Sequence, residues 1–424
     1  RRQRQMCIRD RRKTAEILEN RTDEFAQILT REEGKTITEA RVEVSRAVQT
    51  ISLSGEEAKR IQGETVPLDG APGWTGQLGF TLRVPCGVVT AISPFNFPLN
   101  LVCHKVGPAL AAGCTMVCKP ASSTPISSLA LAELARRAGI PKGVLNVVTG
   151  SASVIGREIT SNSTVRKITF TGSTEIGKLL MELSAQTMKK ISMELGGHAP
   201  FIVFEDADIE AAIAGAIAAK YRNTGQTCVC ANRIYVHQDI YEKFSEGFAR
   251  EAGKLQTGQG FDPSADQGPL IDEAALAKVE EHVADAKNHG GEVMLGGHPH
   301  ELGGLFYEPT VIKNANDEML LAHEETFGPV APLFSFSTEE EVIARANNTP
   351  FGLASYFYTS DLAKSWRVSE QLEYGIVGLN TGIISTEMAP FGGIKESGMG
   401  REGSKYGVED YLETKYISIA GIDE

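Results

Sequence analysis

Gly87-Val-Val-Thr-Ala-Ile92 opens the stretch of sequence that decides the fold. It is a short apolar run rich in β-branched residues, which is typical of a buried strand. Similar runs follow at Gly113-Cys-Thr-Met-Val-Cys118, Val144-Leu-Asn-Val-Val148 and Lys167-Ile-Thr-Phe-Thr171. The Ala- and Leu-rich segment 129–138 lies between two of these runs and predicts a helix. Strands that alternate with helices predict a parallel sheet covered by helices.

A second series of the same kind starts at Phe201-Ile-Val-Phe204 and continues with Arg233-Ile-Tyr-Val236. Amphipathic patterns over 241–254 and 272–288 predict helices that cover this second sheet. We therefore expect two α/β domains rather than one.

The composition is that of a well-packed protein without a membrane span. The chain has 424 residues, 42% hydrophobic and 23% charged, which is enough for two or three domains. Its apolar stretches are too short to cross a bilayer. A net charge of -12 spread along the chain disfavours a nucleic-acid partner. Seven cysteines without the spacing of a disulfide framework favour a reducing compartment, and we expect a cytoplasmic protein.

The first thirteen residues differ in character from the rest. They carry seven Arg or Lys against one Asp and lack the Ser-rich pattern of a transit peptide. Whether residues 1–13 are native stays open at this point. Apolar residues recur at helical spacing after Thr14, so we expect the chain to start inside a helical region with an N-terminal piece missing.

Cys228 and Glu194 carry the first chemical signal. Cys228 ends the run Gly225-Gln-Thr-Cys228, in which the glycine permits close approach of another segment and the turn can expose the thiol to a base. Glu194 precedes two glycines, which fits a carboxylate at the end of a strand. An inert buried cysteine and a surface glutamate are the plain alternatives. Cys228 and Cys230 have no His or Cys pair at zinc-ligand spacing, so we expect no metal site.

The passage from Phe170 to Lys178 is a weaker signal for phosphate binding. It follows a strand and opens a helix, whose N-terminal N–H groups attract anions. It lacks the glycine spacing of the usual dinucleotide turn, and Leu179 stands where a P-loop needs Ser or Thr. Phosphate binding and an ordinary strand-to-helix turn both stay open.

Seven motifs resemble the aldehyde dehydrogenase superfamily, in the order of that family, from about residue 14 to the C-terminus. They are Ser93-Pro-Phe-Asn-Phe-Pro98, Lys119-Pro-Ala-Ser122, Phe170-Thr-Gly-Ser173, Glu194-Leu-Gly-Gly197, Gly225-Gln-Thr-Cys228, Glu325-Thr-Phe-Gly-Pro329 and Pro390-Phe-Gly-Gly393. The resemblance implies an α/β fold with two Rossmann-like parallel-sheet domains and a small β oligomerisation unit.

The resemblance also assigns catalytic roles. Cys228 would attack the aldehyde carbon as a thiolate, while the Asn96 amide and the backbone N–H of Cys228 hold the oxyanion. Hydride transfer from the thiohemiacetal to NAD or NADP would leave a thioester. Glu194 would act as general base for the water that hydrolyses this thioester. A carboxylic acid is the expected product, because CoA-acylating relatives do not use this base.

The same resemblance implies where the cofactor binds. The expected cofactor residues are Phe95, Lys119, Ser122, Gly172, Ser173, Leu195, Glu325 and Phe327. Lys119 and Glu325 would bind ribose hydroxyls. In this family a carboxylate three residues after the lysine repels a 2′-phosphate, and that position here is Ser122. We therefore expect NADP to be accepted, and preferred over NAD.

Three segments look most like succinate-semialdehyde dehydrogenases. They are 222–232, 380–385 and 400–407. Those enzymes hold the far carboxylate of the substrate with two arginines and a serine, and Arg222 and Ser385 match one arginine and the serine. His104 replaces the other arginine, and an imidazole lacks its permanent charge and fork geometry. Succinate semialdehyde is the leading substrate, with glutarate semialdehyde or phosphonoacetaldehyde as alternatives. His104 either binds an anion when protonated or packs within a helix.

Cys230 matches a cysteine that can pair with the nucleophile as a reversible disulfide in this family. A strand over 228–230 would place both thiols on one face, and simple packing is the alternative. Cys230 is therefore a candidate for a redox switch, and such a switch would show itself as reversible inhibition of the enzyme by mild peroxide.

The resemblance divides the chain into three units. Residues 1–72 and 87–195, completed by about 390–408, would bind the cofactor, and 196–389 would form the catalytic domain. Residues 73–86 and 409–424 would form the oligomerisation unit, whose exposed strand edges need a partner chain. A homodimer or homotetramer is expected. A cofactor-independent thiol hydrolase and a catalytically silent nucleotide-binding protein stay open as other classes.

Overall fold

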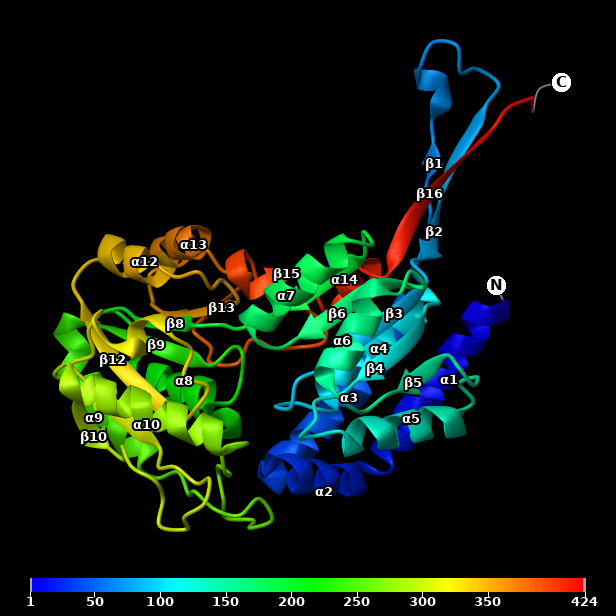
Figure 1. Ribbon diagram of the computed structural model, residues 1–424. Coiled ribbons are helices and arrows are strands. Elements are labelled where there is room, and N and C mark those ends of the chain that lie inside the picture. The colour runs from blue at the N-terminus through cyan, green and yellow to red at the C-terminus, as the bar shows by residue number, and fades with distance from the viewer. Residues whose placement is uncertain (1, 422–424) are drawn as a thin grey trace.

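Three sheets organise the computed structural model, which describes residues 2–421 and the side chains of residues 9–421. Two sheets lie in separate α/β bodies that stand side by side, and the third forms a narrow arm that projects from one body (Figure 1). The expected fold, two bodies with largely parallel sheets plus a small β unit, is confirmed. The described part of the chain contains no helix with both the length and the apolar character to span a bilayer.

The first body is built on a six-stranded sheet. Its strands are β3 (Val88–Ile92), β4 (Thr115–Lys119), β5 (Leu145–Val147), β6 (Val165–Thr171), β7 (Lys190–Glu194) and β15 (Gly398–Met399). Their order is β15-β7-β6-β3-β4-β5, and all neighbours are parallel except β15 and β7. The helices of this body are α1 (Arg2–Glu19), α2 (Thr22–Glu33), α3 (Ile37–Glu57), α4 (Asn100–Ala112), α5 (Ile126–Ala138), α6 (Ala152–Ser161), α7 (Thr174–Ala185) and α14 (Ser404–Glu409).

The second body is built on a seven-stranded sheet. Its strands are β8 (Ala199–Val203), β9 (Ala231–His237), β10 (Glu292–Leu295), β11 (Thr310–Lys313), β12 (Val330–Phe336), β13 (Ala354–Tyr358) and β14 (Ile376–Leu379). Their order is β10-β11-β12-β9-β8-β13-β14, with only β10 antiparallel to its neighbour. The helices are α8 (Ile209–Tyr221), α9 (Tyr241–Ala252), α10 (Glu273–Asn288), α11 (Leu320–His323), α12 (Glu339–Asn347) and α13 (Leu362–Gln371). Short 3-10 turns are η1 (Leu68–Gly70), η2 (Arg222–Gly225), η3 (Gln238–Ile240) and η4 (Lys395–Ser397).

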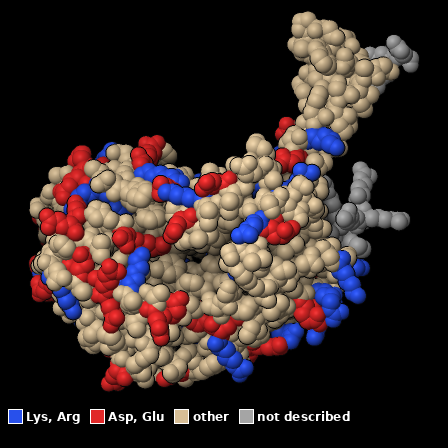
Figure 2. All heavy atoms as spheres, viewed as in Figure 1, with Lys and Arg blue, Asp and Glu red and all other residues tan. Residues whose placement is uncertain are grey.

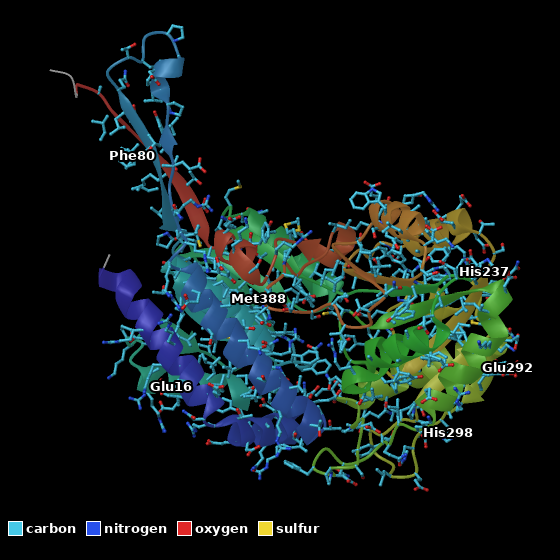
Figure 3. The ribbon with its side chains drawn as sticks, turned by 180° about the vertical axis from the view of Figure 1, so that it is seen from behind. Glu16, Phe80, His237, Glu292, His298 and Met388 are labelled. Carbon is cyan, nitrogen blue, oxygen red and sulfur yellow. The ribbon has the colours of Figure 1, made fainter. Side chains whose placement is uncertain are left out.

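The arm consists of β1 (Thr65–Val66), β2 (Leu78–Pro85) and β16 (Leu412–Ile419), which pair antiparallel. Strand β2 pairs with β16 along its whole length. Figure 3 labels Phe80 on the arm, away from both bodies, and little of the arm's visible face in Figure 2 is basic or acidic. The arm sheet thus starts at residue 65, before the expected boundary at 73, and residues 422–424 lie outside the described residues.

The basic N-terminal segment is part of a regular helix. Helix α1 spans residues 2–19 and packs on α3 and α5. Asp10 and Arg11 on this helix are buried. Residues 9–13 therefore contribute to the first body in the same way as the residues after Thr14, and residue 1 lies outside the described residues.

Candidate active site

The six-stranded sheet brings several predicted site residues to one edge. Its strands β3, β4, β6 and β7 end at, or lead directly into, Asn96, Lys119, Ser173 and Glu194. Ile92 at the end of β3 lies opposite Lys119, and Thr171 at the end of β6 lies opposite Glu194. Parallel strands present their carboxyl ends at the same edge, which is where ligands bind in open α/β sheets.

Cys228 comes from the second body, in the turn between α8 and β9. The backbone before it is strained, because Asn223 and Thr224 have φ angles of 51° and 58° in the left-handed region. Gly225 has a φ of 75°, and a Cβ there would lie 2.1 Å from the carbonyl oxygen of Gly328. The close approach of another segment that this glycine predicted is present. It fixes the loop that leads to the thiol.

The Cys228 and Glu194 motifs meet across the two bodies. A Cβ on Gly197 would lie 2.3 Å from the carbonyl oxygen of Cys228. Burial raises the pKa of the Cys228 thiol well above its ordinary value, and the nearby Glu194 carboxylate raises it further, while the positive charge of Arg222 lowers it. The thiol must therefore lose a proton before its sulfur can attack an aldehyde.

Glu194 has the protonation behaviour of a general base. Burial raises its pKa to about 7, and the charge of Glu402 adds to this effect, while Lys105 opposes it. The Cys228 thiol and the Thr171 hydroxyl lie beside this carboxyl group and also oppose the rise in its pKa. The fully buried Lys105 ammonium donates to the Thr171 hydroxyl at 2.6 Å and forms an ion pair with Glu402. A carboxyl group with a pKa near neutrality can accept a proton from water.

Asn96 is held against the loop that carries Cys228. Its side-chain amide donates to the carbonyl oxygen of Gln226 at 3.0 Å. The main-chain carbonyl oxygen of Asn96 accepts from the Lys35 ammonium at 2.7 Å and from the Asn223 side-chain amide at 3.0 Å. Lys35 is fully buried and forms an ion pair with Glu43 on α3 at 2.7 Å. These contacts join Asn96 to both bodies and place its amide near the thiol.

A cavity of about 480 Å³ connects these groups, and its size fits a ligand-binding cleft. Predicted residues that line it are Phe95, Asn96, Lys119, Gly172, Ser173, Glu194, Leu195, Cys228, Glu325 and Phe327. Ser122 is exposed and is not among the lining residues. The cavity is mainly apolar with a few converging polar groups, as is typical of dinucleotide sites.

The start of α7 forms a cradle at the wall of this cavity. Gly172 leaves space that a Cβ would fill, since that atom would lie 2.5 Å from the Phe170 ring. The Ser173 hydroxyl accepts from the backbone N–H of Ile176 at 3.4 Å and caps the twelve-residue helix α7. The positive end of the helix dipole and its free N–H groups suit a phosphate there. These residues fit the pyrophosphate of NAD or NADP.

The remaining cofactor residues lie at both ends of the cavity. The Lys119 ammonium donates to the carbonyl oxygen of Pro120 at 3.0 Å. Glu325 accepts from the backbone N–H of Gly197 at 3.2 Å, and burial raises its pKa to about 8. The Phe327 and Phe95 rings pack edge to face, with centroids 5.9 Å apart. An ammonium and a carboxylate with spare hydrogen-bonding capacity fit sugar hydroxyls.

A second, smaller pocket of about 40 Å³ also borders Cys228. Arg222, Ser385 and His104 all line it, as the sequence predicted, and Arg46 from α3 joins them. Burial and then the positive charge of Arg222 lower the pKa of Arg46, so the two guanidinium groups lie close enough to repel each other. An anion bound between two arginines relieves this repulsion and can accept paired hydrogen bonds from each.

His104 is not a cation in this pocket at neutral pH. It is buried on α4, and burial lowers its pKa to about 4, while the charge of Glu402 opposes the shift. Its Nδ1 atom has no hydrogen-bond partner in the structure. A neutral imidazole can donate one hydrogen bond to an anion but supplies no charge. The second positive charge of the pocket comes from Arg46.

Cys230 directly precedes strand β9 and does not lie on it. Residues 228–230 form a turn in which the backbone N–H of Cys230 donates to the carbonyl oxygen of Thr227 at 3.0 Å. The Cys230 thiol is fully buried and donates to the carbonyl oxygen of Lys220 at 3.0 Å. The redox role of Cys230 stays a prediction. Among residues 2–421, no group of three His, Cys, Asp or Glu side chains could hold a metal ion.

Sequence reasoning missed four charged residues of this site. They are Lys35, Arg46, Lys105 and Glu402. The run Glu32-Glu33-Gly34-Lys35 offered one signal, because a basic residue beside acidic ones and a glycine can mark a buried ion pair. The other three stand in ordinary helical or loop sequence. Only the folded chain shows that Lys105 and Glu402 are buried and paired and that Arg46 lines the small pocket.

Comparison with known proteins places these motifs in a family. The profile of the aldehyde dehydrogenase family matches residues 2–417. The chain is 57% identical to a glutarate-semialdehyde dehydrogenase of Pseudomonas aeruginosa, covering 96% of this chain and 83% of that protein. It is also 57% identical to the succinate-semialdehyde dehydrogenase [NADP(+)] of Escherichia coli, covering 94% and 82%. The solved succinate-semialdehyde dehydrogenase of Burkholderia pseudomallei superposes with a TM-score of 0.96 at 52% identity, covering 99% of this chain and 86% of that one. The chain therefore belongs to the aldehyde dehydrogenase family and is an oxidoreductase.

Proposed function

We propose that this chain oxidises a small aldehyde that carries a carboxylate at its far end. Succinate semialdehyde is the leading substrate, and glutarate semialdehyde is the second. The observation that carries the proposal is the pair Arg46 and Arg222, which line one pocket beside Cys228. Two guanidinium groups and the Ser385 hydroxyl match the hydrogen-bonding capacity of a carboxylate. The names of two similar proteins, for succinate and glutarate semialdehyde, support the same substrate class.

Cys228 is the proposed nucleophile. Its thiol loses its proton to solvent, its sulfur bonds to the aldehyde carbon, and the carbonyl oxygen becomes an oxyanion. The Asn96 amide and the backbone N–H of Cys228 are the proposed donors to this oxyanion. Lys35 supports this geometry through its bond to the carbonyl oxygen of Asn96. NAD or NADP, when bound in the large cavity, supplies the acceptor for the hydride of the aldehyde carbon.

Glu194 is the proposed base for the second half of the reaction. After oxidation the acyl group is bonded to the Cys228 sulfur, and a water must attack it. Glu194 takes a proton from this water, so that the thiolate of Cys228 leaves and a carboxylic acid forms. A pKa of about 7 suits this exchange, because the group is then both a usable acceptor and readily regenerated.

We also propose that the chain accepts NADP and prefers it to NAD. Ser122 is exposed and lies three residues after Lys119, where a carboxylate would repel a 2′-phosphate. The Escherichia coli relative is named for NADP. Comparison of kcat/KM with the two cofactors tests this preference, and an equal or higher value with NAD would contradict it.

The arm supports the proposal that the chain forms a homodimer or homotetramer. It carries exposed apolar side chains that a partner would cover. They include Trp74, Leu78, Leu82, Tyr416 and Ile419. The arm sheet also leaves strand edges unpaired. We further propose the expected division into cofactor-binding, catalytic and oligomerisation units, and a cytoplasmic location.

A panel of aldehydes tests the function. Succinate semialdehyde, glutarate semialdehyde, phosphonoacetaldehyde and a neutral aldehyde of similar length are each assayed at 340 nm with both cofactors. We expect the two carboxylated aldehydes to have the highest kcat/KM. In Arg222→Ala the KM for carboxylated aldehydes should rise by about 10-fold or more, because charge-assisted hydrogen bonds are lost.

The neutral aldehyde serves as the internal control. Its KM should be almost unchanged in Arg222→Ala, since it makes no bond to the guanidinium. Equal losses for charged and neutral aldehydes would contradict the anion pocket. Release of product without a signal at 340 nm would instead indicate a cofactor-independent thiol hydrolase, and cofactor binding without turnover would indicate a silent protein.

A further inference from the structure

Cys86 and Cys114 lie apart from the proposed catalytic site, and their sulfur atoms are 3.7 Å from each other. Cys86 directly follows β2 of the arm, and Cys114 directly precedes β4 of the six-stranded sheet. Strands β3 and β4 pair in parallel from Val88 opposite Thr115, so both cysteines stand at the same end of neighbouring strands. Neighbouring strands lie about 4.8 Å apart, which is within the Cα separation that a disulfide spans.

Both cysteines also bond to the same carbonyl group. The backbone N–H of Cys86 donates to the carbonyl oxygen of Tyr411 at 3.0 Å, and the Cys114 thiol donates to it at 3.5 Å. Tyr411 is the residue before β16. The pair therefore lies at the root of the arm, where β2 and β16 enter the first body.

We propose that Cys86 and Cys114 are a redox-modification site that forms a reversible disulfide and fastens the root of the arm to the six-stranded sheet. The site is separate from Cys228 and Cys230. Cys86 is only half-buried, so a small oxidant such as hydrogen peroxide reaches the pair from solvent, whereas Cys114 is 3% exposed. A larger thiol reagent reaches Cys86 first.

The Cys114 thiol gives up its hydrogen bond to the Tyr411 carbonyl oxygen when it ionises, and its other contacts favour this ionisation. The hydrogen bond from the Cys86 thiol lowers the pKa of Cys114, and the backbone N–H groups of Gly87 and Cys86 and the buried ammonium of Lys167 act in the same direction. The same contact raises the pKa of Cys86, because that thiol keeps the shared proton. Lys167 is fully buried, with its ammonium 5.1 Å from the centroid of the Tyr411 ring.

The chemistry balances with one molecule of peroxide. The Cys114 thiolate attacks a peroxide oxygen, breaks the O–O bond and becomes a sulfenic acid, and the displaced hydroxide takes up a proton to give water. The Cys86 sulfur then attacks the Cys114 sulfur and forms the S–S bond, while the sulfenic oxygen leaves as a second water with the thiol proton. Two thiols lose two electrons and two protons, and the peroxide is reduced to two waters. Dithiothreitol reverses the reaction.

The bond would close a loop with a role in the proposed active site. Residues 86–114 contain β3, the loop with Asn96, and α4 with His104. Joining the ends of this loop lowers the conformational entropy of the unfolded chain and so stabilises the folded one. We therefore expect oxidation to raise the thermal midpoint of unfolding by at least about 2 °C.

The experiment compares the full chain with Cys86→Ala and with Cys118→Ala, a matched control at a fully buried cysteine on the same sheet. Each protein is treated with equimolar hydrogen peroxide, blocked with N-ethylmaleimide, digested without reduction and analysed by mass spectrometry. Peptides that contain Cys86 and Cys114 should be joined in the unaltered chain and in Cys118→Ala, and dithiothreitol should separate them. Reduced Cys86→Ala should keep the basal kcat/KM, and its thermal midpoint should not rise on oxidation.

Two outcomes overturn the proposal. One is the absence of the joined peptide while Cys228 or other cysteines are oxidised, which would mean that the pair does not react as a unit. The other is a joined peptide whose formation leaves the thermal midpoint unchanged, which would mean that the bond does not fasten the arm. Both readouts are independent of the aldehyde and cofactor, so they stand whatever substrate the chain uses.

Discussion

The two pockets that meet at Cys228 are built in different ways. The large cavity is formed mostly by the carboxyl ends of parallel strands, a helix start and glycines, so its shape depends on the backbone of the six-stranded sheet. The small pocket is formed by side chains from α3, α4, η2 and the segment after β14, which are distant in the sequence. Backbone geometry gives the first pocket its shape, whereas side-chain charge gives the second its selectivity.

This difference predicts which substitutions should reduce the turnover of every aldehyde and which should affect only one class of aldehyde. A change at Cys228, which borders both pockets, or at Glu194 in the large cavity should lower kcat/KM for all aldehydes. A substitution in the small pocket should lower kcat/KM only for aldehydes that carry an anionic group at the far end. A change at the exposed rim of the cofactor site should alter only the choice of cofactor.

The largest effect is expected for Cys228→Ala, because Cys228 borders both pockets. Without the sulfur no covalent intermediate forms, and kcat/KM should fall at least about 1,000-fold for every aldehyde. Steady-state assays at 340 nm measure this loss, and fluorescence titration with NADP shows whether the cavity still binds its cofactor. A loss confined to carboxylated aldehydes would contradict a nucleophile common to all substrates.

Glu194→Gln should lower kcat by about 100-fold or more, because hydrolysis of the thioester loses its base. In the unaltered chain kcat should fall as pH falls through about 7, since protonated Glu194 cannot accept a proton from water. A rapid burst of reduced cofactor should persist in Glu194→Gln, while the pH-dependent limb near 7 should disappear. Stopped-flow absorbance measures both, and a lost burst would assign Glu194 to the first half of the reaction instead.

Arg46→Ala gives the sharpest test of the small pocket. Loss of a charge-assisted contact worth about 1.5–3 kcal/mol should raise KM for succinate semialdehyde by about 10- to 100-fold and leave a neutral aldehyde almost unaffected. Arg41→Ala is the matched control, because Arg41 is an exposed arginine on the same helix α3. Similar KM changes in both variants, or no change in either, would contradict the proposal that Arg46 binds the far carboxylate of the substrate.

The smallest effect is expected for Ser122→Glu. A carboxylate at this exposed position should repel the 2′-phosphate and lower kcat/KM with NADP by about 10-fold or less, with little change for NAD. The effect should weaken at high salt, because exposed charges are screened. Ser123→Glu, one residue further along, is the control, since it is exposed but is not at the predicted position.

The same contrast explains how much could be predicted from the sequence. The β3, β4, β5 and β6 strands were visible in the sequence as short apolar runs. The resemblance to the aldehyde dehydrogenase superfamily named the residues of the large cavity, and parallel pairing explains why those at the strand ends converge. Gly225 was also interpretable, because a glycine before a reactive residue indicates close approach of another segment.

The small pocket could be predicted only in part. Arg222 lies next to the Cys228 motif in the sequence. Arg46 lines the same pocket from helix α3, far away in the sequence, and no local sequence pattern predicts that the two residues lie together. The neutral state of His104 depends on its burial, which a sequence does not show. For the same reason the ion pair of Lys105 with Glu402 and the bond from Lys35 to Asn96 were missed. The turn at Cys230 could not be told from a strand in the sequence, because short apolar segments suit either structure.

The contact between Gly197 and Cys228 limits which substitutions such chains can accept during evolution. Any β-carbon at position 197 would collide with the main chain of the nucleophile, 2.3 Å away, rather than with a side chain that can rotate. Position 197 lies in the segment that joins β7 of the first body to β8 of the second, and it cannot change independently of the Cys228 loop. A lineage that replaced this glycine would have to move Cys228 as well. Divergence should therefore accumulate around the small pocket, where new substrates can be accommodated one side chain at a time.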